Sequence, residues 1–260
     1  MFLYFLKTIY IIFLLLLLNI CIGLPYFLSF FLSKEYIKSI YQNTMNYLNN
    51  FSSLIGIYSK IKFNFNEEYN KNKWNLIICN HTSFIDNFIA SKFYALNNIN
   101  WFNIKGVSHP ANFLEKYFLT LFDIFITTKN LKNDVNYFNK LLYKWRKNNK
   151  KYQIILYPEG TIYENQNSNY QNLLNPKTGI FNLLINKIPE IKYIYDLNII
   201  YKVKNKRLVG DYEIIMNLAN PDFEIIVHVN QYLNKNLDND WLLKKWDLKD
   251  KWINNQLLTN

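Results

Sequence analysis

Short apolar runs alternate with stretches of helical periodicity along most of the chain beyond residue 70. The run Tyr152–Tyr157 is almost wholly apolar, which is typical of a strand buried on both faces of a sheet. Residues 134–146 instead carry apolar side chains three or four positions apart, the spacing of one face of a helix. The pattern predicts strands at 74–79, 99–104, 121–126, 152–157, 195–201 and 223–229, and helices at 84–96, 111–121, 134–146 and 178–188.

This alternation predicts an α/β fold, because neighbouring parallel strands need helical crossovers between them. We therefore expect a mostly parallel central sheet with helices on both faces, formed by one domain over residues 71–260. Residues 34–70 mix polar and aromatic side chains and are predicted to be a connecting arm.

The N-terminal segment is the most apolar part of the chain. Residues 8–32 are long enough to span a bilayer, which takes about 20 apolar residues, so residues 1–33 are predicted to be a membrane anchor. A single span and a helical hairpin bent at Gly23 and Pro25 both fit. A cleaved signal peptide fits less well, because Lys7 alone precedes the apolar core. Four lysines follow the segment by residue 62, which places the domain on the cytosolic side of an endomembrane.

Charge and cysteine content narrow the function classes. The formal net charge is +11, but the cations are dispersed among asparagines and form no stripe, so nucleic acid is not an expected partner. Basic charge does favour contact with anionic lipid. Cys21 and Cys79 are the only cysteines, which excludes a disulfide framework, and Cys79 is predicted to be a buried structural residue. His109 and His228 lack ligand-spaced neighbours, so no metal site is predicted.

His81 and Asp86 are the first candidate catalytic residues. His81 follows the predicted strand 74–79, where open α/β sheets present their chemistry. Five positions on one helix are about 140° out of phase. The two side chains can therefore meet only if His81 lies in a loop and Asp86 in the first turn of the next helix. Residues 83–86 have the form of a capping box, with Ser83 as N-cap, and a capping box alone would also explain Asp86. A histidine oriented by a carboxylate is the usual general base for deprotonating a hydroxyl group.

A second motif, Pro158-Glu159-Gly160-Thr161, follows the predicted strand 152–157. Gly160 permits close approach of the backbone, and exposed amides with the Thr161 hydroxyl could hold a phosphate or a glycerol oxygen. Glu159 could orient a lysine or accept a hydrogen bond from a substrate hydroxyl. Two candidate cations complete the predicted anion site: Lys105, taken to end the second strand, and Lys177, just before a predicted helix.

With both motifs in this order, the chain resembles the 1-acylglycerol-3-phosphate acyltransferase family of lysophospholipid acyltransferases. The likeness covers residues 70–258 and is strongest to the lysocardiolipin and lysophosphatidylinositol acyltransferase subgroup. It rests on His81 with Asp86, on the block 158–161, and on three further blocks at 173–181, 194–201 and 223–257, the last ending in a Trp- and Lys-rich helix. The chain departs from many relatives in two places: it carries Lys129 and Ile162 where they have arginines.

The resemblance implies an acyl-CoA-dependent O-acyltransferase that acylates the free hydroxyl of a lysophospholipid at a membrane. His81 would be the general base and Asp86 its partner, while Glu159, Gly160 and Thr161 would bind the acceptor. Acyl-CoA would be a co-substrate, and no cofactor is expected. The alternative is a catalytically inactive, membrane-anchored lipid-binding protein of the same fold, which the missing arginines favour and the retained His81 and Asp86 oppose.

Overall fold

The computed structural model describes residues 61–258 apart from 66–67, 101–102, 111–115, 118, 121, 129 and 165, and before them only residues 9, 32–33, 35–37, 39–40 and 43. The strands are β1 (Ile61–Asn64), β2 (Trp74–Cys79), β3 (Ile104–Ser108), β4 (Phe125–Ile126), β5 (Gln153–Leu156), β6 (Ile191–Val203), β7 (Lys206–Leu208) and β8 (Phe223–Leu233). The helices are α3 (Asp86–Leu96), α5 (Leu131–Lys147), α6 (Thr178–Lys187), α7 (Gly210–Asn217) and α8 (Trp241–Leu258).

The strands form one sheet in the order β1-β8-β6-β2-β5-β3-β4, with β7 paired to β6. Strands β6, β2, β5, β3 and β4 run parallel to one another, and β1 runs parallel to β8. Only the pairs of β6 with β7 and with β8 are antiparallel. The predicted α/β fold with a mostly parallel sheet is confirmed.

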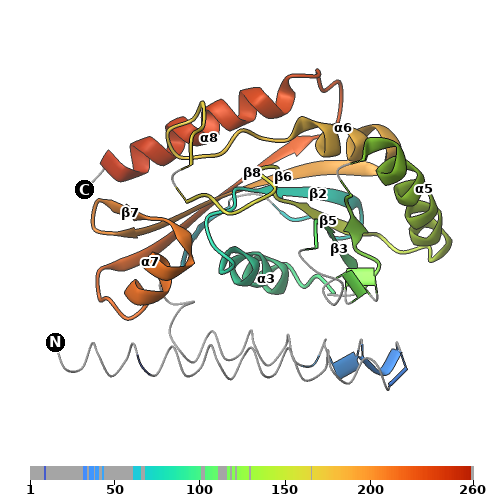
Figure 1. Cartoon of the computed structure of the whole chain (residues 1–260), viewed down its shortest axis with the longest axis horizontal. Coiled ribbons are helices and arrows are strands. Elements are labelled where there is room, and N and C mark those ends of the chain that lie inside the picture. The colour runs from blue at the N-terminus through green and yellow to red at the C-terminus, as the bar shows by residue number, and fades with distance from the viewer. Residues whose placement is uncertain are drawn as a thin grey trace.

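Helices cover both faces of the sheet, as predicted (Figure 1). Side chains alternate along β2, so that Leu76 and Ile78 pack into one buried cluster with residues of α5, α6 and α8. Ile77 and Cys79 point to the other face and pack with residues of α3 and α7. The near-continuous apolar run of β2 follows from this double burial. Cys79 is buried and free.

A buried ion pair fixes α8 on the sheet. Lys249 of α8 lies 2.6 Å from the Asp196 carboxylate on β6 and also donates a hydrogen bond to the Leu197 carbonyl oxygen at 2.9 Å. Both charged side chains are almost fully buried. A buried charge without its partner is strongly unfavourable. The pair therefore specifies how the last helix docks.

Two strands differ from the sequence predictions. The predicted strand 99–104 begins only at Ile104, because the Asn103 amide donates to the Asn100 carbonyl in a turn. The predicted strand 121–126 is reduced to Phe125–Ile126, because Asp123 adopts φ 56° in a turn.

Other differences concern segments outside those strands. Residues 61–64, within the predicted connecting arm, form β1 and pair with β8. The short elements β7 and α7 were not predicted. The predicted helix 111–121 and the membrane anchor at 1–33 lie mostly outside the described residues. Within the part of the chain that the structure describes, no helix is long and apolar enough to cross a membrane.

Candidate active site

The 81–86 turn connects the end of β2 to the start of α3. Its first residue is fixed by Asn80, whose side chain donates to the Ile199 carbonyl at 2.9 Å and accepts from the Ile199 amide at 2.8 Å. Asn80 is fully buried. The Asn80 side chain therefore bonds to the backbone of β6 as a neighbouring strand would. This fixes the position at which the turn begins.

His81 and Asp86 meet across this turn. The imidazole Nδ1 lies 2.9 Å from Asp86 Oδ2. The same oxygen accepts from the amides of Thr82 at 2.7 Å and Ser83 at 3.0 Å, while Oδ1 accepts from the Tyr201 hydroxyl at 2.7 Å. Asp86 is 0% exposed. A carboxylate surrounded by donors in this way is held rigidly and needs no water.

This arrangement fixes the tautomer of His81. An ionised carboxylate only accepts hydrogen bonds, so Nδ1 carries the proton and Nε2 keeps its lone pair. Burial and the adjacent Asp86 carboxylate hold the pKa of Tyr201 well above its ordinary value, so the phenol stays protonated and donates to Asp86. Nε2 is therefore free to take a proton from a bound hydroxyl group.

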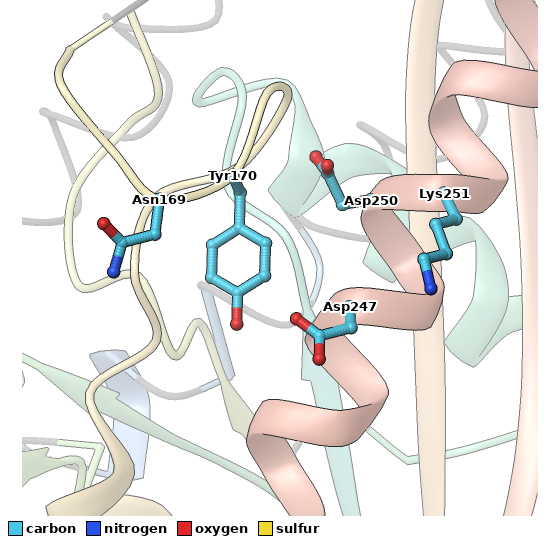
Figure 2. Close-up of a pocket in the computed structure, with 5 residues that line it drawn as sticks. All are labelled: Asn169, Tyr170, Asp247, Asp250 and Lys251. Carbon is cyan, nitrogen blue, oxygen red and sulfur yellow. The ribbon is translucent and has the colours of Figure 1, made fainter.

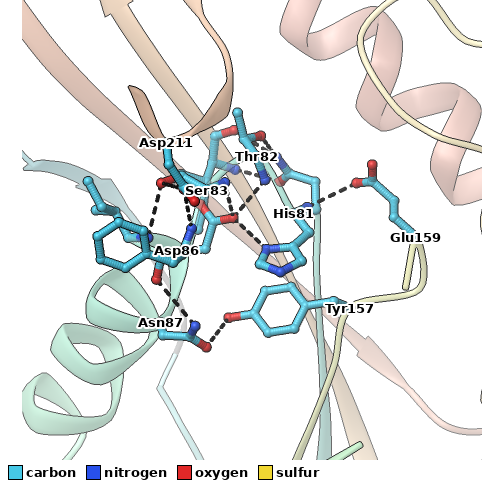
Figure 3. A network of polar contacts seen from close by, with 12 residues as sticks. His81, Thr82, Ser83, Asp86, Asn87, Tyr157, Glu159 and Asp211 are labelled. Carbon is cyan, nitrogen blue, oxygen red and sulfur yellow. Dashed lines mark hydrogen bonds and ion pairs between the residues drawn. The ribbon is translucent and has the colours of Figure 1, made fainter. Parts of the chain in front are cut away.

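Tyr157 supports the imidazole from below. Its ring stacks on His81 with centroids 4.4 Å apart and planes at 29°, and its hydroxyl donates to the Asn87 side chain at 3.1 Å. Figure 3 shows the imidazole between Asp86 and Tyr157. The His81 side chain is 18% exposed, so the ring is only partly covered by the protein.

The predicted capping box with Ser83 as N-cap is not formed, because α3 begins at Asp86 with Ile85 as its N-cap and without a side-chain cap bond. Asp86 accepts from the Ser83 amide, which is the reciprocal half of the motif. The Ser83 hydroxyl accepts from the Ile85 amide at 3.1 Å, one residue short of the usual position. Asp86 therefore binds the backbone of the turn that precedes α3 and orients His81.

Glu159 holds the backbone of the 81–86 turn. One carboxylate oxygen accepts from the His81 amide at 3.0 Å and the other from the Leu174 amide at 2.9 Å. Nearby, the Tyr163 amide donates to the His81 carbonyl at 2.7 Å. Glu159 is 1% exposed. Both oxygens accept from internal amides, so Glu159 positions the His81 backbone in this structure, and its predicted role in acceptor binding stays a prediction.

Glu159 also predicts a pH dependence of stability. Burial raises its pKa from 4.5 to about 7, against the opposing effect of the two backbone hydrogen bonds. The folded state then binds this proton more tightly than the unfolded state, so stability falls as pH rises from about 4.5 to about 7. The difference between the two pKa values corresponds to about 3 kcal/mol in the free energy of unfolding.

The variant Glu159→Gln removes this titration. Its free energy of unfolding, relative to wild type, is expected to rise by about 3 kcal/mol between pH 5 and pH 8. Urea denaturation of both proteins at several pH values measures the difference, in which all other titrating groups cancel. A constant difference across that range would contradict the assignment.

Gly160 and Lys177 lie together at the exposed side of the site. Gly160 adopts φ +71°, and a Cβ built on it would lie 2.6 Å from the Lys177 ammonium nitrogen. The Lys177 amide donates to the Pro158 carbonyl at 2.8 Å, which ties the start of α6 to the motif. Gly160, Thr161 and Lys177 are exposed. The predicted grouping of this lysine with the motif is therefore present.

Lys105 does not belong to this group. It is the second residue of β3, not the last, and pairs with Ile154 of β5. It therefore lies roughly 10 Å along the strand from the carboxyl end at Ser108. Lys105 is 6% exposed, and its ammonium donates to the Phe122 carbonyl at 3.0 Å. The structure thus places Lys105 away from Gly160 and Lys177, and its acceptor-binding role stays a prediction.

Arg207 of β7 is a cation that the sequence did not reveal. It stacks over the Tyr163 ring at 4.9 Å, and its guanidinium donates to the Asn172 carbonyl at 2.7 Å. Burial lowers its pKa, although nearby carboxylates oppose this. Arg207 thereby joins β7 to the loop that reaches Glu159 through Leu174. No local signal could have identified it.

A polar pocket of about 380 Å³ lies on the outer side of that loop, lined by Asn169, Tyr170, Asp247, Asp250 and Lys251 (Figure 2). Asp250 of α8 accepts from the amides of Gln171 at 3.3 Å and Asn172 at 2.7 Å. None of the predicted site residues lines this pocket. Its carboxylates therefore help α8 to hold the loop.

Fold and site together define an α/β protein with a histidine–aspartate pair arranged for proton transfer. The chain belongs to the Acyltransferase family, whose model matches residues 60–202. It is 26% identical over 147 residues to lysophosphatidylinositol acyltransferase 10 of Caenorhabditis elegans, a match that covers 48% of this chain and 37% of that relative. The chain thus spans little more than a third of that relative's length.

A solved structure has the same fold. The crystal structure of the 1-acyl-sn-glycerophosphate (LPA) acyltransferase PlsC from Thermotoga maritima superposes with a TM-score of 0.55. The superposition covers 99% of this chain and 98% of that one, at 13% sequence identity. At this identity the likeness concerns the fold alone.

Proposed function

We propose that this chain is an acyl-CoA-dependent O-acyltransferase that acylates the free hydroxyl of a lysophospholipid. His81 is the general base, and Asp86 orients it and stabilises its charged form. The observation that carries the proposal is the 2.9 Å contact between His81 Nδ1 and the buried Asp86 carboxylate, which leaves Nε2 as the nitrogen that can act as the base.

The chemistry follows from this geometry. Nε2 removes the proton as the acceptor oxygen attacks the thioester carbonyl, and the new C–O bond forms. Collapse of the tetrahedral intermediate breaks the C–S bond, and the imidazolium returns its proton to the departing thiolate. The acyl group passes directly to the acceptor. Asp86, excluded from water, stabilises the imidazolium by charge.

Gly160, Thr161 and Lys177 bind the anionic part of a substrate in this proposal. The support is the exposed Lys177 ammonium group, which lies beside Gly160 with its left-handed backbone. Lys177 directly precedes α6, and the start of a helix favours bound anions. The two relatives are named for lysophosphatidylinositol and lysophosphatidate, both of which carry a phosphate. We therefore propose a lysophospholipid of this anionic class, lysocardiolipin included.

We also propose that the chain acts at a membrane, with its domain on the cytosolic side. The apolar stretch at residues 8–32 and the net charge of +11 support this placement. Extraction of membranes with alkaline carbonate tests whether the chain is inserted, because a peripheral protein is released and an inserted one is retained.

The variant Gly160→Ala tests the anion site. A Cβ at φ +71° is strained by about 1–2 kcal/mol, and it displaces the Lys177 ammonium. We expect a higher KM for the lysophospholipid with a smaller change in kcat. The matched control is Gly179→Ala, because a Cβ there meets nothing within 4 Å. Equal KM values for the two variants would contradict the assignment of the site.

The proposed function is tested with the full chain purified in detergent. Oleoyl-CoA is offered with a panel of lysophospholipids that differ in head group, and the products are identified by mass spectrometry. We expect one anionic class to be converted to its diacyl form. Binding of the lipids without any product, across the whole panel, would instead support the catalytically inactive lipid-binding protein.

A further inference from the structure

The segment 206–217, comprising β7 and α7, lies against the 81–86 turn. It is more than 100 residues away in sequence and falls outside residues 60–202, which the family model matches. Figure 3 shows Asp211 of this segment beside Ser83. The segment supports the turn at a different place from Glu159, which binds the His81 amide.

Four hydrogen bonds join the segment to the turn, the longest from the Arg207 guanidinium to the Thr82 hydroxyl at 3.5 Å. Asp211 Oδ1 accepts from the Ser83 hydroxyl at 2.7 Å and from the Phe84 amide at 2.8 Å. The Gly210 amide donates to the Thr82 carbonyl at 3.2 Å. Gly210 adopts φ +74°, which lets the chain bend into α7 and bring both groups to the turn.

These bonds fix the part of the turn on which Asp86 depends. The amides of Thr82 and Ser83 both donate to Asp86 Oδ2, the oxygen that also binds His81. Residues 82–84 lie in neither a helix nor a strand, so no regular ladder holds them. A turn without such a ladder keeps one conformation only if its polar groups have fixed partners.

We propose that Asp211 is a positioning residue for the His81–Asp86 pair, an inference that rests on the proposed acyltransferase function. Asp211 binds Ser83 and Phe84, and thereby aims the Thr82 and Ser83 amides at Asp86. The functional unit then extends beyond the matched residues to include α7.

Three variants separate this role from general support of α7. Asp211→Ala removes the acceptor. Asp211→Asn keeps an amide oxygen that can accept from both Ser83 and Phe84. Glu213→Ala is the matched control, because Glu213 lies on the same helix but its carboxylate accepts from Val209 and Lys206 of its own segment.

Two readouts are measured on the full chain: steady-state kinetics with oleoyl-CoA and the accepted lysophospholipid, and amide hydrogen exchange of a peptide covering residues 80–87. We expect Asp211→Ala to lower kcat by about 10–100-fold, because small displacements of reacting groups are this costly. KM for oleoyl-CoA should stay near wild type. Exchange in the 80–87 peptide should quicken in Asp211→Ala alone, and Asp211→Asn should restore most of both properties.

The proposal would be overturned if Asp211→Ala matched Glu213→Ala in kcat and in exchange. It would also be overturned if Asp211→Asn were as impaired as Asp211→Ala. The proposed function fails separately. If the wild type is inactive with every acceptor, faster exchange confined to Asp211→Ala would still establish that Asp211 holds the turn, and unchanged exchange would refute that role as well.

Discussion

Replacing Asp86 with alanine is expected to destabilise the fold by about 3–5 kcal/mol and to abolish acyl transfer. The substitution leaves three buried donors without an acceptor: the amides of Thr82 and Ser83, and the Tyr201 hydroxyl. Chemical denaturation measures the loss of stability. An Asp86→Ala protein as stable as wild type would show that the buried network does not hold the turn.

Asp86→Asn separates the charge of this residue from its hydrogen bonds. An amide oxygen at the position of Oδ2 still accepts from Thr82, Ser83 and His81, and the Tyr201 hydroxyl can turn to accept from the new amide group. We expect a folded protein whose kcat is lower by about 10²–10³-fold, because the imidazolium loses its counter-charge. Full activity in Asp86→Asn would contradict the electrostatic role.

His81→Ala is expected to lower kcat by about 10²–10⁴-fold while the fold remains intact. The imidazole is partly exposed, and Asp86 keeps three other donors when it is removed. Initial rates and thermal unfolding of the purified variant measure the two properties.

His109→Ala is the matched control for that variant. His109 is an exposed histidine whose ring binds only the Thr127 carbonyl in the described structure. Its loss is expected to leave the rate near wild type. Comparable losses in the two variants would point to a general effect of removing a histidine and would argue against His81 as the base.

The local part of the site could be predicted from the sequence. His81 and Asp86 are only five residues apart, between a buried apolar strand and the start of a helix. Whether their side chains can meet therefore depends on local spacing, which the sequence shows. The same logic placed Gly160 at the end of β5 and Lys177 at the start of α6. The amphipathic pattern of α5 and the apolar runs of β2 and β5 identified the layers of the fold, because burial on both faces leaves a continuous apolar signature.

The rest depends on contacts that no local pattern encodes. Tyr201, Arg207 and Asp211 come from segments that follow the turn by more than 100 residues, and each is an ordinary residue within its own element. Lys105 was predicted at the end of the second strand, because Gly106 weakens the strand signal beyond it. The strand in fact continues through Gly106, which packs between Ile124 and Ile155. Glu159 follows β5 as expected, but its carboxylate binds the amides of His81 and Leu174. These partners are distant in the sequence, so only the fold could show them.

Acyl transfer to a lipid hydroxyl is expected to depend on the His81–Asp86 pair. Free CoA and diacyl lipid are measured together, in one reaction of oleoyl-CoA with lysophosphatidylinositol or whichever acceptor the panel selects. We expect the two products to appear in equal amounts with wild type and at least about 10²-fold more slowly with His81→Ala. CoA released without diacyl lipid, or equal rates for the two proteins, would contradict it.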